Sequence, residues 1–184
     1  MKAPKLIVAF VGMPGSGKTE ATKFLESRGF ARVYFGGTVV EEVKKLKLDV
    51  NEKNEKAVRE ELRAKHGMEA MAKLNEKNIN NGLKTKNVII DGLYSLEEYL
   101  WLKKKYGDKL IVIALYTPQK LRIKRLGSRP LRPLNEKEVK ERDLTQFKNL
   151  HTGGPIAIAD YTIINEGGLD ELKKNINNLM DKLK

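Results

Sequence analysis

The chain has 184 residues and no cysteine, so disulfides, thiolate zinc sites and cysteine nucleophiles are excluded, and two histidines leave little room for a histidine-built metal centre. Thirty-six basic residues against 24 acidic ones give a net charge of +12, which suits anionic small substrates, a nucleic acid or simply a lysine-rich surface. No cleavable leader and no apolar run near the roughly 20 residues of a membrane span are visible, so we expect one cytoplasmic domain over residues 1–184, without a membrane partner.

The first predicted elements are a strand, a glycine-rich turn and a helix. Residues 5–11 are apolar after Lys5, as in a strand buried on both faces, and residues 18–28 carry apolar side chains at helical spacing. The turn between them has the complete P-loop pattern in its proper setting. Its backbone N–H groups would surround phosphate, the lysine would reach the β and γ phosphates, and the threonine hydroxyl would bind Mg²⁺. We therefore predict nucleotide binding by Gly12, Met13, Pro14, Gly15, Ser16, Gly17, Lys18 and Thr19.

A run of helices is predicted next. A short strand at 32–35 leads to Gly36-Gly37, and residues 38–83 have helical patterns with breaks near Asp49 and Gly67. Within this run, Arg59 and Arg63 lie one helical turn apart. They could bind a phosphate of an acceptor molecule, or they could equally pair with neighbouring glutamates on the surface.

A second chemically interesting strand end follows. Residues 87–90 form a buried strand that ends at Asp91-Gly92. The Asp91 carboxylate could hold a magnesium-bound water or accept the proton of an attacking group, whereas its alternative role is to cap the turn. Ser95, with Glu98 three residues later, predicts the start of a helix that reaches about Tyr106. The aromatic residues of that helix are expected to pack on the sheet rather than stack on bases.

Basic residues gather beyond the third buried strand at 110–116. Pro118 suits the first turn of the next helix, and two prolines within 127–134 predict a loop. Arginines that close over phosphate oxygens would stabilise the charge that develops in phosphoryl transfer, and we select Arg125, Arg129 and Arg142 for that role. Residues 119–134 contain six basic side chains and no acidic one: Lys120, Arg122, Lys124, Arg125, Arg129 and Arg132.

The remaining elements are a helix at 135–149, a loop containing Gly153-Gly154-Pro155, a strand at 161–164 and a helix at 169–183. Alternating strands and helices predict an α/β fold, with a parallel sheet covered by helices on both faces. The loops that carry chemistry then lie at the carboxyl ends of the strands. Residues 12–19, Asp91 and Thr117-Pro118 all fall at that edge.

Several later segments resemble one family. They are Asp91-Gly92 with residues 95–98 (Ser-Leu-Glu-Glu), Arg142-Asp143, and residues 159–167 (Ala-Asp-Tyr-Thr-Ile-Ile-Asn-Glu-Gly). Together with the P-loop they make nearly the whole chain similar to the archaeal adenylate-kinase-related P-loop proteins, which are related to dephospho-CoA kinases and nucleoside monophosphate kinases. The resemblance implies a nucleotide-kinase-like P-loop NTPase fold with five parallel strands in the order 2-3-1-4-5. It also implies an acceptor-side helical insertion at about 36–84, a short arginine-bearing lid at about 125–142, and a position for Asn165 near the adenine.

Two departures from the family pattern concern the acceptor. Where the family has Asp-Val-Val-Arg, residues 37–40 read Gly-Thr-Val-Val, and where it has Asp-Gly-Val-Arg, residues 91–94 read Asp-Gly-Leu-Tyr. Val40 and Tyr94 thus stand where relatives carry acceptor-side arginines, while Arg63 matches a family arginine. The resemblance therefore implies that the donor site is preserved and that the acceptor side, where Tyr94 lies, is altered. The chain would then use a different acceptor, or none.

Two functions follow as hypotheses. The leading one is a small-molecule kinase that transfers the γ-phosphoryl group of MgATP to a nucleotide-like acceptor of the dephospho-CoA or nucleoside monophosphate class, with weak ATPase activity possible. The alternative is a nucleotide-dependent switch whose charge engages RNA or an acidic protein. No nucleic-acid motif and no Asn-Lys-x-Asp guanine signature is present, and both a monomer and a homodimer are compatible with the sequence.

Overall fold

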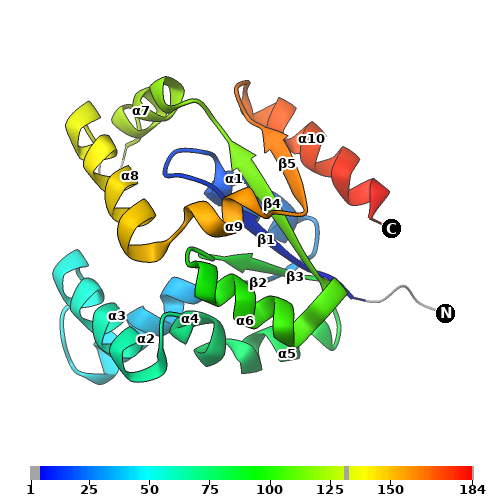
Figure 1. The fold of residues 1–184 in the computed structure, drawn as a ribbon. Coiled ribbons are helices and arrows are strands. Elements are labelled where there is room, and N and C mark those ends of the chain that lie inside the picture. Colours follow the sequence, from blue (N-terminus) through cyan, green and yellow to red (C-terminus); the bar gives the residue numbers. More distant parts are fainter. Residues whose placement is uncertain (1–4, 131–132, 184) are drawn as a thin grey trace.

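The centre of the molecule is a five-stranded parallel sheet, seen in a computed structural model that describes residues 5–130 and 133–183. The strands are β1 (Ile7–Val11), β2 (Ala31–Tyr34), β3 (Val88–Asp91), β4 (Leu110–Tyr116) and β5 (Tyr161–Ile164). They lie in the order β2-β3-β1-β4-β5, and every neighbouring pair is parallel (Figure 1). The predicted fold class and strand order are confirmed, and so are the limits of β4 and β5, while the limits of the other three strands differ by one or two residues.

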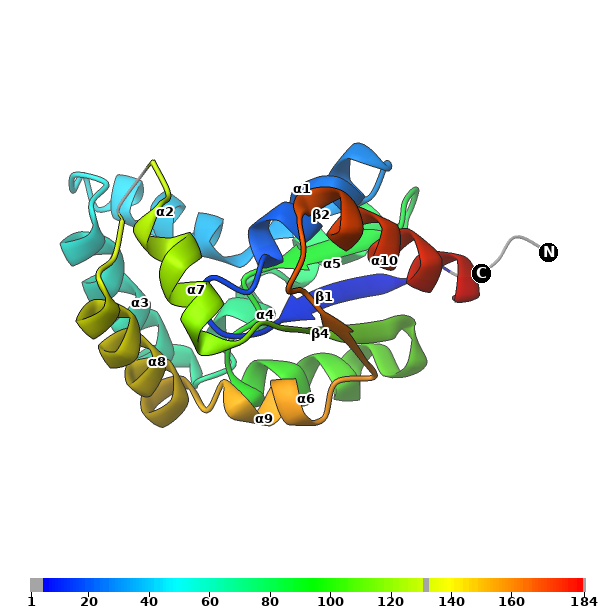
Figure 2. The ribbon, with the colours of Figure 1, turned by 90° about the horizontal axis from the view of Figure 1, so that it is seen from above.

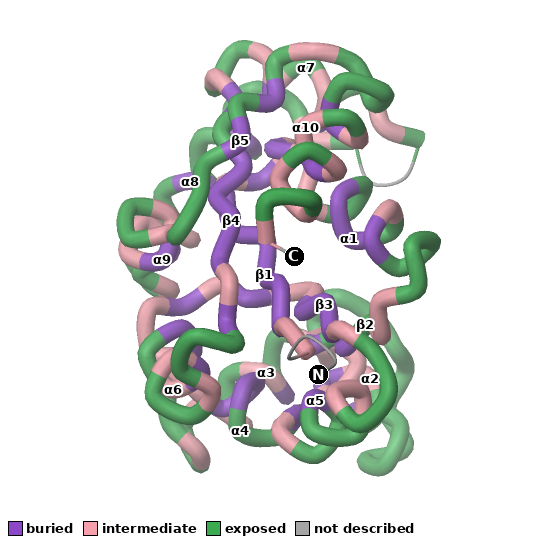
Figure 3. The backbone as a smooth tube through the Cα atoms, turned by 90° about the vertical axis from the view of Figure 1, so that its right-hand side faces the viewer, coloured by how far each residue is buried: buried purple, intermediate pink, exposed green. Residues whose placement is uncertain are grey.

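Helices cover both faces of the sheet (Figure 2). On one face α1 (Lys18–Ser27) and α10 (Leu169–Lys182) pack on alternate strand residues, and this layer contains Ala21, Leu25, Leu172 and Ile176 against Val8, Phe10, Ile89, Ile113, Leu115 and Ile163. The residues between them face the opposite layer, because side chains alternate along a strand. Figure 3 shows the result as buried strands surrounded by helices with exposed outer sides.

The chain between β2 and β3 forms four helices that pack on the opposite face of the sheet. They are α2 (Phe35–Lys45), α3 (Glu52–His66), α4 (Ala70–Leu74) and α5 (Glu76–Leu83). The predicted breaks near Asp49 and Gly67 are confirmed. The predicted helix start at residue 38 is wrong, because α2 includes both glycines that were expected to precede it. Phe35, Val39 and Val43 lie four residues apart and are all buried, so packing outweighs a cost of roughly 1 kcal/mol per helical glycine.

The helix after Asp91 starts as the sequence predicts. In α6 (Leu96–Tyr106) the Ser95 hydroxyl accepts a hydrogen bond from the Glu98 N–H at 3.0 Å, and the Glu98 carboxylate accepts one from the Ser95 N–H at 3.1 Å. Tyr99 is buried in the core, and Trp101 and Tyr106 pack against it. The expectation that these aromatic residues pack on the sheet is confirmed.

The C-terminal part holds α7 (Gln119–Gly127), α8 (Glu136–Leu150) and α9 (Gly153–Ala157). The predicted loop at 153–155 is wrong, because these residues begin a short helix with a buried Pro155. Proline is tolerated there since the first turn of a helix needs no N–H from it. Arg132, one of the six basic residues, lies outside the described residues. Figures 1 and 2 place α7, α8 and α3 at the same end of the molecule as the turn between β1 and α1.

No helix in residues 5–130 and 133–183 combines the length and the apolar character needed to cross a lipid bilayer.

Candidate active site

Three glycines in the turn between β1 and α1 have positive φ, and two of them allow an especially close approach of other segments. Gly12 has φ +149°, and a Cβ there would lie 2.5 Å from the Leu115 carbonyl oxygen. Gly17 has φ +100°, and its Cβ would lie 2.5 Å from Asn165 Nδ2. The turn can therefore approach β4 and the segment after β5 closely only because both positions lack a side chain. The Asn165 amide donates to the Ser16 carbonyl at 2.8 Å, which joins the predicted adenine-side residue to the P-loop.

Lys18 begins α1 and is folded over the turn. Its Nζ donates to the carbonyls of Gly12 at 2.6 Å and Met13 at 3.1 Å. The pKa of Lys18 is lowered from 10.5 to about 8, mainly by burial and then by the positive charge of Arg142, while Asp91 opposes the shift. The Nζ also lies 5.9 Å from the centre of the Tyr94 ring. An anion in this place would relieve the destabilised charge of Lys18.

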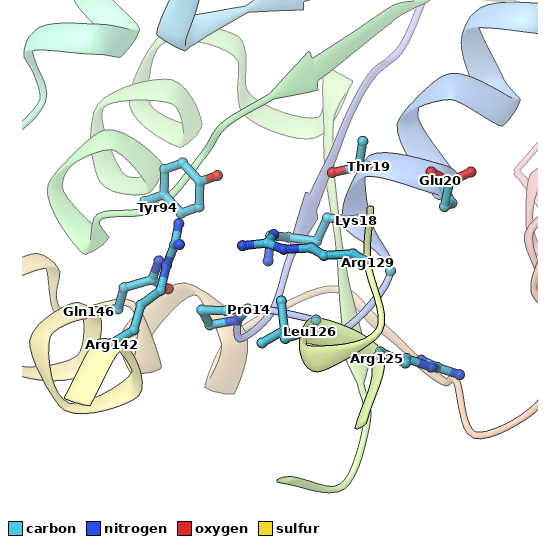
Figure 4. A pocket seen from close by; sticks show the side chains of 12 residues that line it. Pro14, Lys18, Thr19, Glu20, Tyr94, Arg125, Leu126, Arg129, Arg142 and Gln146 are labelled. Atoms are coloured by element: carbon cyan, nitrogen blue, oxygen red, sulfur yellow. The ribbon is translucent and has the colours of Figure 1, made fainter. Parts of the chain in front are cut away.

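A cavity of about 300 Å³ opens in front of the turn. In Figure 4, Lys18 and Arg129 point toward the side where Tyr94 and Arg142 lie, with Thr19 on the opposite wall. The structure therefore brings together most of the predicted site residues, from four separate segments. The cavity is lined by Pro14, Gly15, Gly17, Lys18, Thr19, Glu20, Tyr94, Arg125, Leu126, Arg129, Arg142 and Gln146.

Arg125 lies between this cavity and a second one of about 280 Å³. Its guanidinium donates to the carbonyls of Asn165 at 3.1 Å and Gly167 at 2.9 Å. Figure 4 shows its side chain turned away from Lys18, so its predicted contact with a transferring phosphoryl group stays a prediction. The second cavity is lined by Gly17, Glu20, Arg125, Asn165, Gly167, Gly168, Leu169 and Leu172.

A buried ion pair, which the sequence did not predict, connects the segments that form the site. Arg122 and Asp143 are 6% and 8% exposed, and the two side chains form a double hydrogen bond at 2.9 and 2.7 Å. The same guanidinium donates to the carbonyls of Pro14 at 3.0 Å and Thr117 at 3.2 Å. One side chain thus connects α8, the P-loop and the end of β4. A signal existed, because Arg122 lies four residues before the apolar Leu126 and so shares its buried helix face.

Asp91 is absent from the cavity lining but close enough to influence Lys18. Its Oδ2 accepts hydrogen bonds from Arg32 Nε at 3.1 Å and Arg32 Nη2 at 2.5 Å. Asp91 follows Ile89 by two residues, so both face the layer that α1 covers. The carboxylate therefore lies on the α1 side of the sheet, at the edge where α1 begins.

The predicted acceptor arginines, Arg59 and Arg63, lie on α3 outside the lining of both cavities. Burial lowers the pKa of Arg63, although the Glu98 carboxylate opposes this, and the buried Nε of Arg63 has no hydrogen-bond partner among the described residues. The Oε1 of Gln146, on the cavity wall, is also buried without a hydrogen-bond partner among the described residues, and the sequence did not predict a role for Gln146. Unpaired buried polar atoms are rare, so both atoms are candidates for contact with a bound molecule.

The two histidines have structural positions. His66 is the last residue of α3, and His151 Nδ1 lies 3.1 Å from Glu97 Oε1. His151 ends α8 with a positive φ of 51°. Neither residue lines the two cavities.

Comparison with known proteins adds a family and a fold. A family model described as an AAA domain matches residues 8–146. A UPF0200 protein of Thermococcus onnurineus is 35% identical over 182 residues, which covers 97% of this chain and 98% of that protein. A UPF0200 protein of Hyperthermus butylicus is 30% identical over 183 residues and covers 98% and 96%.

Among solved structures, TT1252 from Thermus thermophilus has a TM-score of 0.67 at 17% identity and covers 99% of this chain and 100% of its own. Shikimate kinase from Acinetobacter baumannii, solved in complex with shikimate, has a TM-score of 0.58 at 21% identity and covers 98% and 95%. At these identities the likeness shows a shared P-loop kinase-like fold.

Proposed function

Because the chain belongs to the AAA domain family and to the archaeal UPF0200 proteins, with a fold shared by small-molecule kinases, we propose that it is a P-loop kinase. It transfers the γ-phosphoryl group of MgATP to a small nucleotide-like acceptor of the dephospho-CoA or nucleoside monophosphate class. The observation that carries the proposal is the cavity in which Lys18, Arg129 and Arg142 surround one space in front of the P-loop.

The donor nucleotide would extend across both cavities. The triphosphate would lie in the first cavity, against the P-loop and the cations Lys18, Arg129 and Arg142. The base would lie in the second cavity, beside Leu169 and Leu172. Gly17, Glu20 and Arg125 line both cavities, so a single extended molecule can occupy them. Fixed cations around the γ-phosphoryl group would stabilise the charge of the transition state without reorganisation.

Mg²⁺ fits this arrangement through few protein ligands. The Thr19 hydroxyl is in the first turn of α1, and Asp91 lies on the same side of the sheet. No group of three or more histidine, aspartate or glutamate residues in residues 5–130 and 133–183 could hold a metal by itself, so phosphate oxygens would complete the coordination. The bound ion would neutralise charge on the β and γ phosphates.

The acceptor would bind against the cavity wall formed by Tyr94, Arg142 and Gln146, across from Lys18 and Thr19. A phosphate or hydroxyl bound there would face the γ-phosphoryl group across the cavity. Tyr94 replaces the positive charge of a family arginine with an aromatic ring and a hydroxyl, which weakens attraction for an acceptor phosphate and favours contact with a planar or hydroxylated group. Arg63 on α3 would bind a part of the acceptor farther from the reaction.

ADP release tests the proposal directly. Purified protein with MgATP is screened against nucleoside monophosphates, dephospho-CoA and related hydroxyl compounds by a coupled ADP assay. We expect one acceptor class to raise ADP release above the rate with ATP alone, because a positioned acceptor replaces a poorly positioned water. ATP binding without stimulation by any small acceptor, but with stimulation by RNA or a protein, would favour the switch hypothesis instead.

The pH dependence of nucleotide binding should follow Lys18. Its pKa in the free protein is about 8 and a bound triphosphate raises it, so binding above pH 8 takes up a proton. Affinity is therefore highest below pH 8 and falls as the pH rises above it. Calorimetry at pH 8.5 in buffers of different ionisation enthalpy should show proton uptake for the wild type and none for Lys18→Met. Equal proton uptake in both proteins would contradict this assignment.

A further inference from the structure

The contact between Arg32 and Asp91 is asymmetric. Both guanidinium hydrogen bonds, from Nε at 3.1 Å and Nη2 at 2.5 Å, go to the same carboxylate oxygen, Oδ2. No described residue donates a hydrogen bond to Oδ1. The carboxylate is therefore held by one oxygen while the other remains available.

The register of the sheet explains why these residues meet. Arg32 pairs with Ile89 and Tyr34 pairs with Asp91, so Arg32 and Asp91 project from the same face of neighbouring strands, two residues apart along the sheet. The Arg32 guanidinium lies 5.4 Å from the Tyr34 ring centre and 3.6 Å from the Glu26 carboxylate of α1. The ring limits the directions that the guanidinium can take, whereas the ion pair with the exposed Glu26 is weak.

A purely structural role explains this contact poorly. β2 and β3 are already joined over four residue pairs, and the side chain of Arg32 is 31% exposed. The Asp91 side chain is 15% exposed, and an ion pair with one solvent-exposed partner adds only modestly to folding stability. Two hydrogen bonds to one oxygen, by contrast, fix the orientation of a carboxylate, as partners of ligating carboxylates do in metal sites.

From this geometry we infer that Arg32 is a positioning residue: it orients Asp91 through Oδ2 so that Oδ1 receives the magnesium-bound water of the nucleotide. The inference rests on the proposed function. It also separates the two roles considered for Asp91, because Oδ2 accepts the two hydrogen bonds of Arg32 and Oδ1 accepts the metal-bound water, so neither oxygen is left to face the attacking group. Asp91 then acts as a fixed hydrogen-bond acceptor rather than as a base.

The affinity gained from magnesium tests this inference without requiring turnover. Calorimetry gives the dissociation constant of ATP with Mg²⁺ and with EDTA, and the ratio of the two constants measures what the ion adds. We expect Arg32→Ala and Asp91→Asn each to reduce this ratio by about 10-fold, the lower end for loss of a partner of a metal ligand. The double variant should lose no more than either single one, because both act through one contact. The affinity for metal-free ATP is measured in the same experiment, so that general charge effects of each variant cancel in the ratio.

Three further variants sharpen the result. Glu26→Gln removes the other ion pair of Arg32 and should leave the ratio at the wild-type value. Arg32→Lys keeps the charge but not the fork of donors, and should recover only part of the loss. In the kinase assay, millimolar guanidinium should restore part of the kcat lost in Arg32→Ala, with KM for the acceptor unchanged. Thermal unfolding confirms that each variant is folded.

The outcomes distinguish this inference from the proposed function. Additive losses in the double variant, or a wild-type ratio in Arg32→Ala alongside a reduced one in Asp91→Asn, would overturn the positioning role while leaving the kinase intact. Wild-type protein that binds no MgATP would overturn the proposed function, and the role of Arg32 with it.

Discussion

Replacing Lys18 with alanine should lower phosphoryl transfer by at least about 100-fold, the effect of removing one group that stabilises transition-state charge. Lys18 is the P-loop cation, and its Nζ reaches only the carbonyls of Gly12 and Met13 in the described structure. Its charge is destabilised by burial, so a triphosphate gains more from this lysine than from an exposed one. Nucleotide affinity measured by calorimetry should fall together with turnover measured by ADP release.

The fold should survive that substitution. Alanine has the highest helix propensity, and Lys18 is the first residue of α1. Lys23→Ala is the matched control, because Lys23 is exposed on the same helix and, among the described residues, its one ion pair is with Glu20 at 3.4 Å. It should keep wild-type turnover. If Lys18→Ala and Lys23→Ala turned over equally fast, the mechanism proposed for the P-loop would be wrong.

Arg122→Met should give the largest loss of stability, about 3–5 kcal/mol, the usual result of leaving one partner of a buried ion pair uncompensated. Asp143 would remain buried at 8% exposure, with only the Gln119 amide at 3.3 Å as a donor among the described residues. The carbonyls of Pro14 and Thr117 would also lose a donor. Chemical denaturation monitored by circular dichroism measures the change in unfolding free energy.

Two comparisons make this prediction specific. Lys120→Met, on the exposed side of α7, should change stability by less than about 0.5 kcal/mol. The double variant Arg122→Met with Asp143→Leu should recover much of the loss, since it removes both buried charges. An Arg122→Met protein as stable as Lys120→Met would show that the pair does not brace the P-loop.

Local patterns predicted the parts of the fold that depend on nearby residues. The apolar run of β1, the glycine turn and the helix after it are short-range features, and the pairing of Ser95 with Glu98 spans three residues. The P-loop contribution to the site was predicted for the same reason. Its backbone geometry is set by eight consecutive residues, among them three glycines with positive φ.

Contacts between distant residues were not predictable in this way. Arg32 and Asp91 are 59 residues apart, and their meeting depends on the register of β2 against β3. Arg122 finds Asp143 only because α7 and α8 pack together. The two wrong predictions, the start of α2 and the loop at 153–155, have the same origin, since burial of Phe35 and Pro155 overrides local preference.

The most direct test of the proposed kinase follows the γ-phosphoryl group itself. Protein is incubated with [γ-³²P]ATP, Mg²⁺ and the acceptor that most stimulates ADP release, and the products are separated by chromatography. The geometry of Lys18, Arg129 and Arg142 around one cavity predicts label on the acceptor, and no transfer in Lys18→Ala. Label found only as inorganic phosphate, at the same rate with and without the acceptor, would contradict the proposed phosphoryl transfer.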